Sequence, residues 1–359
     1  MSYQKRKELI SNLEKVRGSR VLCYFLSDRG TFPPGIPGFS TNLGTEPQLL
    51  FADQLHAIGK TTKIDFFLYT RGGDTNSVWP LVNLLREYCE KLTVIVPFRA
   101  HSGGTLICLG ADEIIMTEFA ELSPIDPTTG NQFNPQDPSN PQARFGISVE
   151  DVAAYFTLSK DRAEIRIESY RFEVFKLLVS NVHPLALGNV QRVYMQIRQL
   201  AKNLLALHMD ENNDGGKIED IVTKLTEKFF SHVHAISRRE AISLLNNLIK
   251  IPEKEEESII FNLFNSYSET LDLRYNFNLP EHIGDNLIYD LKPIGAFIES
   301  TELSHIYTTD IKVAQRPNLP ANVQIQIPPN QPIPLVPWVG RTYDWGIQRI
   351  GWRINDAGL

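Results

Sequence analysis

Cysteine is scarce in this sequence of 359 residues, which contains only Cys23, Cys89 and Cys108. Each lies in an apolar stretch, and none belongs to a CxxC pair or to a zinc-binding spacing. The pattern excludes a disulfide scaffold and a zinc module, and it predicts buried thiols in a reducing compartment. Basic residues are not in excess either, since 36 Lys and Arg face 42 Asp and Glu, a net charge of −6. That balance excludes a dedicated nucleic-acid-binding protein.

Long apolar runs are missing as well. No stretch approaches the about 18 consecutive apolar residues of a membrane span, and residues 1–10 lack the apolar core of a signal peptide. We therefore expect a cytoplasmic protein without a membrane span, which leaves peripheral membrane contact open. No GxGxxG motif is followed by an acidic residue about 20 positions later. We expect neither a cofactor nor a metal ion.

The first third of the chain shows a regular alternation of short apolar runs and amphipathic segments. Strands are predicted over residues 21–26, 64–69, 92–96 and 114–116, and helices over 3–17, 47–59, 77–89 and 102–110. Strands that alternate with helices indicate an α/β layer with parallel strands. Binding and catalytic sites in such sheets form at the carboxyl ends of the strands.

The remainder of the chain divides into a helical part and an extension. After a polar loop over 128–146, helices are predicted over 148–158, 160–180, 186–209, 217–228 and 237–248, with the stretch Asp210–Gly216 as a break. A further helix opens at Pro252, β-like segments follow, and seven prolines fall between Pro317 and Pro337. We expect the aromatic cluster at the end of this tail to dock on a surface; its members are Trp338, Tyr343, Trp345 and Trp352.

Two glycine loops carry the chemistry. Arg71-Gly72-Gly73-Asp74 and Ala100-His101-Ser102-Gly103-Gly104-Thr105 each lie between a predicted strand and a predicted helix. Gly-Gly in the first loop is explained by a tight turn or by an anion site at a helix start. Ser102 alone is explained by a helix N-cap. Together the loops favour a nucleophilic serine beside backbone N–H donors that form an oxyanion hole.

Four motifs in this order resemble the serine dehydrogenase proteinase family: Thr70–Asp74, Val96–Thr105, Gly110–Met116 and Ser123–Pro127. This family is related to the Clp protease proteolytic subunit and to signal peptide peptidase A, within the Clp/crotonase fold. The resemblance implies a serine hydrolase acting on peptide bonds, with Ser102 as nucleophile. It also implies an oxyanion hole from the amides of Gly72, Gly73 and Gly103, and assembly into homo-oligomers.

The general base is not evident, because Leu122–Pro127, where the Clp subunit carries its base, contains neither histidine nor lysine. A serine nucleophile needs a group that takes its proton. The candidates are His101, Lys160, Lys217, His232 and His234. We favour His232, followed by His234; a structural histidine is the alternative for both. Asp126 is a candidate to orient a histidine, or it forms a turn before proline.

The predicted fold is therefore α/β, Clp/crotonase-like, with a helical segment and a C-terminal β-like, proline-rich extension. Residues 1–250 are expected to form the protease domain, with an α/β core over 20–127 and a helical part over 148–250. Residues 251–359 form the extension. The predicted function is a soluble serine peptidase that hydrolyses peptide or protein substrates through an acyl-enzyme at Ser102. The alternative is a catalytically weak or inactive scaffold or binding protein of the same fold that forms homo-oligomers.

Overall fold

The computed structural model describes residues 2–29, 40–125, 128–229, 231, 233–318, 340–355 and 358. The chain forms two compact units. The central unit comprises Leu43–Thr45 and Thr61–Glu253, and the terminal unit comprises Met1–Asn42, Glu46–Lys60 and Lys254–Leu359. The predicted boundary at residue 250 lies close to residue 253, where the chain leaves the central unit. Residues 1–42 and 46–60, however, belong to the same unit as the C-terminal part.

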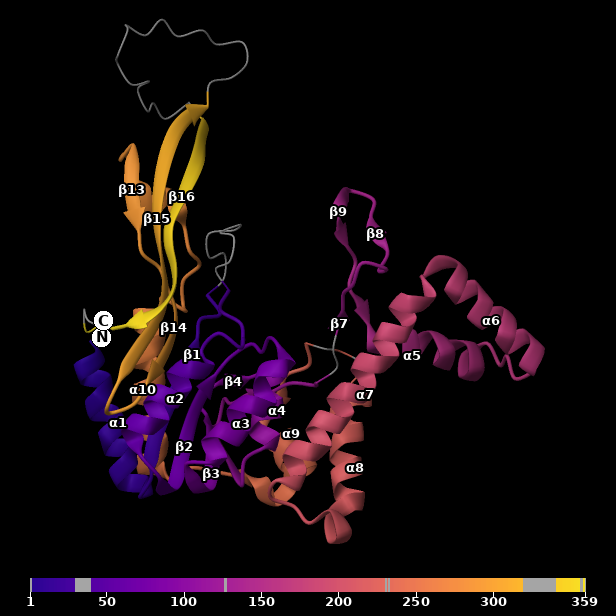
Figure 1. The fold of residues 1–359 in the computed structure, drawn as a ribbon, viewed down its shortest axis with the longest axis horizontal. Coiled ribbons are helices and arrows are strands. Elements are labelled where there is room, and N and C mark those ends of the chain that lie inside the picture. Colours follow the sequence, from indigo (N-terminus) through magenta and orange to yellow (C-terminus); the bar gives the residue numbers. More distant parts are fainter. Residues whose placement is uncertain are drawn as a thin grey trace, which may run out of the picture. The chain divides into compact units, whose positions relative to one another are not determined.

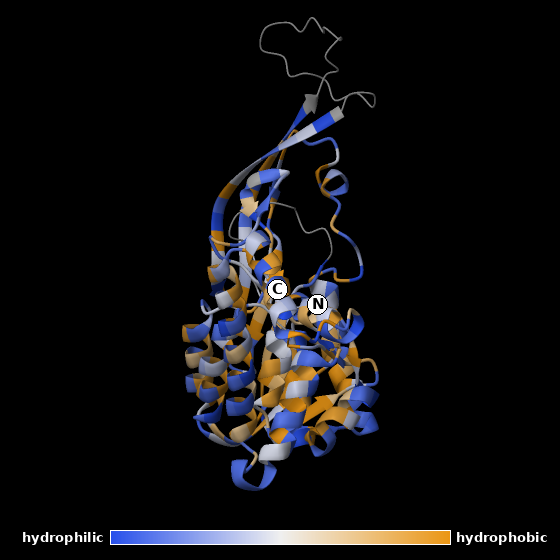
Figure 2. Ribbon diagram, turned by 90° about the vertical axis from the view of Figure 1, so that its right-hand side faces the viewer, coloured by the Kyte–Doolittle hydropathy of each residue, from blue (hydrophilic) through white to orange (hydrophobic). Residues whose placement is uncertain are grey.

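The core of the central unit is a parallel sheet. Its strands are β2 (Thr61–Tyr69), β3 (Cys89–Val96), β5 (Glu113–Met116) and β12 (Ile249–Lys250), and neighbouring strands pair in that order. The last six residues of β2 and the last five of β3 are buried, and these are the apolar runs that predicted the strands. Figure 2 shows hydrophobic residues in the interior strands and hydrophilic residues on outer helix turns. The α/β fold class is confirmed.

The other elements of the central unit are short strands and helices. Two helices, α3 (Val78–Arg86) and α4 (Gly103–Leu109), each follow a strand in the first half of the unit. The short strands are β4 (Arg99–Ala100), β6 (Glu121–Leu122), β7 (Thr128–Thr129), β8 (Gln136–Asp137), β9 (Asn140–Arg144), β10 (Ile147–Ser148) and β11 (Ile236–Ser237). The later helices are α5 (Val149–Thr157), α6 (Glu168–Asn181), α7 (Pro184–Ala206), α8 (Glu211–Glu227) and α9 (Arg238–Leu245). A π-helix, Leu158–Arg162, follows α5, and 3-10 turns cover Thr75–Ser77 and Asn246–Leu248.

Helix α8 corrects the bounds of one prediction, because the break between the helices covers Leu207–Asp210 and not Asp210–Gly216. Asp210 is the N-cap, and its Oδ1 accepts a hydrogen bond from the Asn212 amide at 3.0 Å. The helix then runs through both glycines to Glu227. Each interior glycine costs about 1 kcal/mol relative to alanine. The buried apolar face of the later turns, with Ile218 and Val222, outweighs that cost through tertiary packing.

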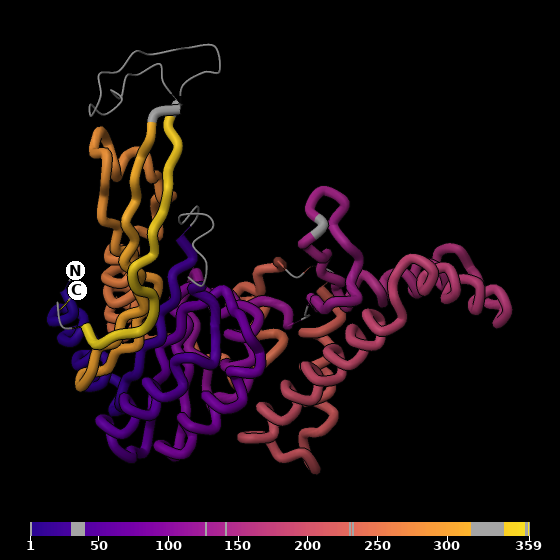
Figure 3. The backbone as a smooth tube through the Cα atoms, turned by 45° about the horizontal axis from the view of Figure 1, so that its top comes forward, coloured from indigo at the N-terminus to yellow at the C-terminus, as the bar shows by residue number. Residues whose placement is uncertain are grey.

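The terminal unit joins both ends of the sequence (Figure 1). Its helices are α1 (Tyr3–Arg17), α2 (Gln48–Ile58), α10 (Lys254–Thr270) and α11 (Leu279–Ile283). Its strands are β1 (Arg20–Leu26), β13 (Ile288–Leu291), β14 (Ile294–Glu299), β15 (Ser304–Asn318) and β16 (Gly340–Ile354), and their pairings with one another are antiparallel. Figure 3 shows the two ends of the chain side by side, where the Tyr3 amide donates to the Gly358 carbonyl at 2.9 Å.

The predicted proline-rich tail lies only partly within the described residues. Residues 319–339, Trp338 included, fall outside them. Tyr343, Trp345 and Trp352 belong to β16. The Trp352 ring lies 5.4 Å from the Tyr307 ring and 6.4 Å from the Tyr24 ring, centroid to centroid. Trp352 therefore docks on the body of its own unit.

A buried ion pair links α1 to β14 in the terminal unit. Arg6 Nε and Nη2 donate to the two carboxylate oxygens of Glu299 at 2.7 and 2.8 Å, and neither side chain is exposed to solvent. The same carboxylate accepts hydrogen bonds from the hydroxyls of Tyr267 and Ser304, at 2.8 and 2.6 Å. The Arg6 guanidinium also lies over the Phe297 ring, 4.6 Å from its centroid. Every oxygen of the buried carboxylate thus has donors, which offsets the cost of removing it from water.

Replacement of Arg6 by methionine is expected to lower the free energy of unfolding by about 3–5 kcal/mol, because it leaves the Glu299 carboxylate buried without its partner. Chemical denaturation of the full chain measures this loss. Removal of the exposed pair Lys176–Glu173 is the control, and it should cost less than about 1 kcal/mol. Equal losses in the two variants would show that the buried pair does not hold α1 in place.

Candidate active site

The first glycine loop follows β2 and lies against the second loop. Gly72 and Gly73 have φ angles of 98° and 149°, which side-chain-bearing residues rarely adopt. A Cβ atom on Gly72 would lie 2.7 Å from Ser102 Cβ and 2.8 Å from the carbonyl oxygen of His101. Glycine is therefore required both for the turn and for the close approach of the two loops.

The second loop turns sharply from β4 into α4 at Ser102. Its backbone has φ 50° and ψ −111°, a conformation that costs a non-glycine residue about 1–3 kcal/mol. Ser102 occupies the N-cap position, yet its side chain accepts no capping hydrogen bond. The N-cap explanation for this serine is therefore wrong. A strained turn from strand to helix, with a partly exposed serine at its apex, has the geometry of a nucleophile elbow.

Two backbone amides beside Ser102 are available as donors. Within the described residues, the amides of Gly73 and Gly103 donate to no acceptor. The Gly72 amide differs, because it donates to the Thr70 hydroxyl at 2.9 Å. Gly72 thus supplies space for Ser102 and not a free donor, in contrast to the role that the resemblance implies. A Cβ atom on Gly103 would lie 3.8 Å from the Gly73 nitrogen, so the two available amides are neighbours.

In a three-stranded sheet, the segment that contains His234 lies at the same end of the strands as Ser102. Strand β6 pairs parallel with β4 and antiparallel with β11. The residues after β4, which include Ser102, and those before β11, which include His234, therefore leave the sheet in the same direction. His234 Nε2 lies 3.1 Å from Glu240 Oε2, and its ring stacks on Phe229 with centroids 4.7 Å apart. His232 and Asp126 lie outside the described residues.

The remaining basic candidates have other surroundings. Lys160 lies in the π-helix after α5, where it lines a cavity with residues of α5, the π-helix and α6, and with neither glycine loop. Lys217 forms an exposed ion pair with Asp214 at 2.6 Å. The structure thus brings neither lysine to Ser102 within one chain.

His101 and Glu121 form a pair that the sequence did not reveal. His101 Nε2 lies 3.1 Å from Glu121 Oε1, and the same oxygen accepts a hydrogen bond from Arg99 Nε at 2.7 Å. Burial lowers the pKa of His101, and the charges of Arg71 and Arg99 lower it further against the opposing effect of Glu121. Glu121 and the Glu240 that faces His234 were missed because a carboxylate several residues from a histidine gives no periodic signal.

The described residues hold no group of three or more His, Cys, Asp or Glu side chains arranged to bind a metal ion. Among the helices that the structure describes, none has the length and apolar character needed to cross a lipid bilayer. Of the three thiols, Cys23 and Cys108 are buried, whereas Cys89 is only partly so.

Comparison with protein families identifies the chain. The family of ClpP-like SDH-type serine proteinases matches residues 1–182, which is half of the sequence. The chain belongs to this family. The match covers both glycine loops, Ser102 and helices α5 and α6, and the ClpP-like α/β fold follows from it.

Two similar proteins come from Methanocaldococcus jannaschii. The uncharacterized protein MJ1495 is 31% identical over 173 residues, 48% of this chain and 58% of that protein. The uncharacterized protein MJ0137 is 33% identical over 126 residues, 35% of this chain and 43% of that protein. The chain thus spans about half of the length of these relatives. Among solved structures, a mutant of the 1510-N membrane-bound stomatin-specific protease covers 60% of this chain and 77% of its own, at 12% identity and a TM-score of 0.36.

Replacement of Gly72 by alanine is expected to destabilise the chain by about 1–3 kcal/mol more than a positive φ alone, because the new Cβ overlaps Ser102 and the His101 carbonyl. Denaturant unfolding checks this. The matched control is Gly18→Ala, since Gly18 has φ 59° but nothing within 4 Å of the added atom. Similar losses for both variants would contradict a close contact between the loops.

Proposed function

We propose that the chain is a serine peptidase in which Ser102 Oγ attacks the carbonyl carbon of a peptide bond. The observation that carries this proposal is the positive φ angle of Ser102 between β4 and α4, together with a side-chain hydroxyl that forms no capping hydrogen bond to the helix. The strain has no evident structural benefit, since a helix start needs no such conformation. Strain of this kind gathers at functional sites, where it aims a reacting group.

The amides of Gly73 and Gly103 are the proposed oxyanion donors. As Oγ bonds to the carbonyl carbon, its proton passes to a base and the carbonyl oxygen becomes an oxyanion that accepts from both amides. Collapse of this intermediate returns the proton to the leaving amine and leaves an acyl-enzyme on Ser102. Water then hydrolyses the ester by the same steps. Each amide donor contributes about 3–4 kcal/mol to the transition state.

The proposed base belongs to the histidine segment before β11, with His232 and His234 as the two candidates. This choice is supported by the pairing directions in the sheet, because the segment after β4 and the segment before β11 lie at the same end of the strands. The Glu240 carboxylate beside His234 Nε2 would hold that imidazole in one orientation and stabilise its charged form. Asp126 remains a proposed orienting carboxylate for His232.

We further propose that the chain forms homo-oligomers through the arm made of α5, the π-helix and α6. None of the 14 residues of α6 is buried, and even the large apolar side chains Tyr170, Phe172 and Leu177 are 60%, 63% and 60% exposed. A helix of this length is marginal without a packed face. The apolar surface therefore requires a partner.

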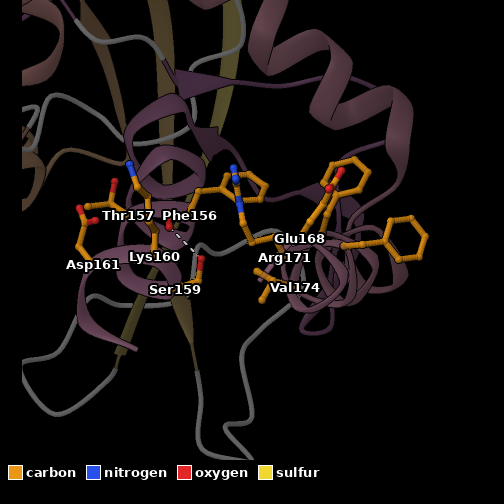
Figure 4. Close-up of a pocket in the computed structure, with 10 residues that line it drawn as sticks. Phe156, Thr157, Ser159, Lys160, Asp161, Glu168, Arg171 and Val174 are labelled. Carbon is orange, nitrogen blue, oxygen red and sulfur yellow. Dashed lines mark hydrogen bonds between the residues drawn. The ribbon is translucent and has the colours of Figure 1, made fainter. Parts of the chain in front are cut away.

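The charges of the arm favour a second copy of the same arm as the partner that covers its apolar surface. The cavity of about 530 Å³ between the π-helix and α6 carries two cations, Lys160 and Arg171, and two anions, Asp161 and Glu168. Figure 4 shows one charge of each sign on either side of this cavity. An interface with two-fold symmetry places one patch against itself, so a patch with balanced charges around aromatic side chains is self-complementary. Peptide or protein substrates and other copies of the chain are thus the proposed partners.

A fluorophosphonate probe is expected to label the wild-type protein and not the Ser102→Ala variant. His232→Gln and His234→Gln identify the base, since loss of the base slows labelling by about 10²–10⁴-fold, whereas loss of a structural histidine leaves the rate of the folded protein close to wild type. Mass spectrometry of the labelled peptide measures both effects. Equal labelling of wild type and Ser102→Ala would overturn the peptidase proposal and favour the scaffold alternative.

Replacement of Phe172 by aspartate is expected to weaken self-association by about 2 kcal/mol, or about 30-fold in the dissociation constant, as for a central aromatic anchor of an interface. Light scattering over a concentration series measures the change. Leu49→Asp is the control, because Leu49 is 79% exposed on α2, outside the arm. A monomeric wild-type protein, or equal effects of both variants, would contradict assembly through the arm.

A further inference from the structure

We propose that Ser123, the residue after β6, is a positioning residue that holds the backbone of Ser102 in its strained conformation. This inference rests on the proposed function, because it concerns the aim of the Ser102 hydroxyl. Ser123 lies 21 positions after Ser102 in the sequence, and nothing in the spacing of the two serines announces their contact.

The contact is a hydrogen bond from the Ser102 amide to the Ser123 hydroxyl oxygen, with a nitrogen-to-oxygen distance of 2.7 Å. Ser123 is 2% exposed, so water does not replace this acceptor easily. The single hydroxyl proton of Ser123 is directed to the Pro124 carbonyl at 2.9 Å. The oxygen lone pairs are therefore left to face the Ser102 amide.

Thr105 fixes Ser123 in turn. The Ser123 amide donates to Thr105 Oγ1 at 3.1 Å, and that hydroxyl donates to the Ala100 carbonyl at 2.8 Å. Thr105 is fully buried in the first half of α4. The two hydroxyls thus join the end of β4, the start of α4 and the residue after β6 around Ser102.

This network has a consequence for the oxyanion donors. Because the Ser102 amide donates to Ser123, it is not available to an oxyanion. The bond fixes the peptide plane before Ser102, and the turn then presents the next amide, that of Gly103, on the side where Gly73 lies. Loss of the acceptor at Ser123 would free the Ser102 backbone to relax toward an ordinary helix start. The Ser102 hydroxyl would then move away from the position required for attack on the substrate carbonyl. A displacement of about 1 Å is enough to lower the rate about 100-fold.

The test compares Ser123→Ala with a buried hydroxyl that has no contact with the elbow. Thr117 is the matched control, since it is fully buried and its hydroxyl donates to the Pro97 carbonyl at 2.8 Å. Fluorophosphonate labelling of Ser102 and steady-state cleavage of a reporter peptide are measured on full-length protein, together with the fraction folded. We expect Ser123→Ala to slow labelling and kcat by about 10–100-fold with KM unchanged, and Thr117→Val to stay within about twofold of wild type per folded molecule. Ser123→Thr, which keeps the acceptor, should recover most of the rate.

The outcomes separate this inference from the proposed function. If wild type is labelled at Ser102 and Ser123→Ala is labelled at the same rate per folded molecule, the inference is overturned and the peptidase proposal stands. If wild type is not labelled, the proposed function fails and the inference fails with it. If Ser123→Ala does not fold, Thr105→Val, which keeps the side-chain shape, decides: slower labelling supports the network, and the wild-type rate overturns it.

Discussion

The backbone of Ser102 is the constraint on which the candidate site depends. An L-residue at φ 50° and ψ −111° does not stay there by its own preference, so the surroundings must hold it. Two features of the surroundings do so. Gly72 has no side chain at the place where a Cβ atom would overlap Ser102, and the Ser123 hydroxyl accepts a hydrogen bond from the Ser102 amide. Two features follow from this single turn: the Ser102 hydroxyl does not cap α4, and the Gly103 amide has no acceptor among the described residues.

The small sheet of β4, β6 and β11 extends the same principle over longer sequence distances. Its strands have only two residues each, yet they bring together segments near residues 100, 122 and 236. Because β6 pairs parallel with β4 and antiparallel with β11, the serine loop and the histidine segment lie at the same end of the strands. Under the proposed mechanism, this arrangement supplies nucleophile and base from opposite ends of the central unit's sequence.

Different forces hold the other parts of the molecule. In the terminal unit, the Arg6–Glu299 pair is satisfied by hydroxyls and aromatic faces, which makes a buried charge tolerable. In the arm, α6 leaves its aromatic residues exposed, and the proposed association with a second copy would remove them from water. The match to ClpP-like serine proteinases ends at residue 182, at the end of this arm.

The sequence by itself determined the α/β class, the family and the two glycine loops, because apolar runs and Gly-Gly turns are local signals. It located the buried halves of β2 and β3 and missed their exposed beginnings, since only the buried residues must be apolar. It misjudged Asp210–Gly216, where tertiary packing outweighs the low helix propensity of glycine. Only the tertiary structure decided that the Gly72 amide is occupied, that Ser123 holds Ser102 and that Glu240 faces His234. Those contacts depend on which segments pack together, and side-chain hydrogen bonds across a fold leave no period in the sequence.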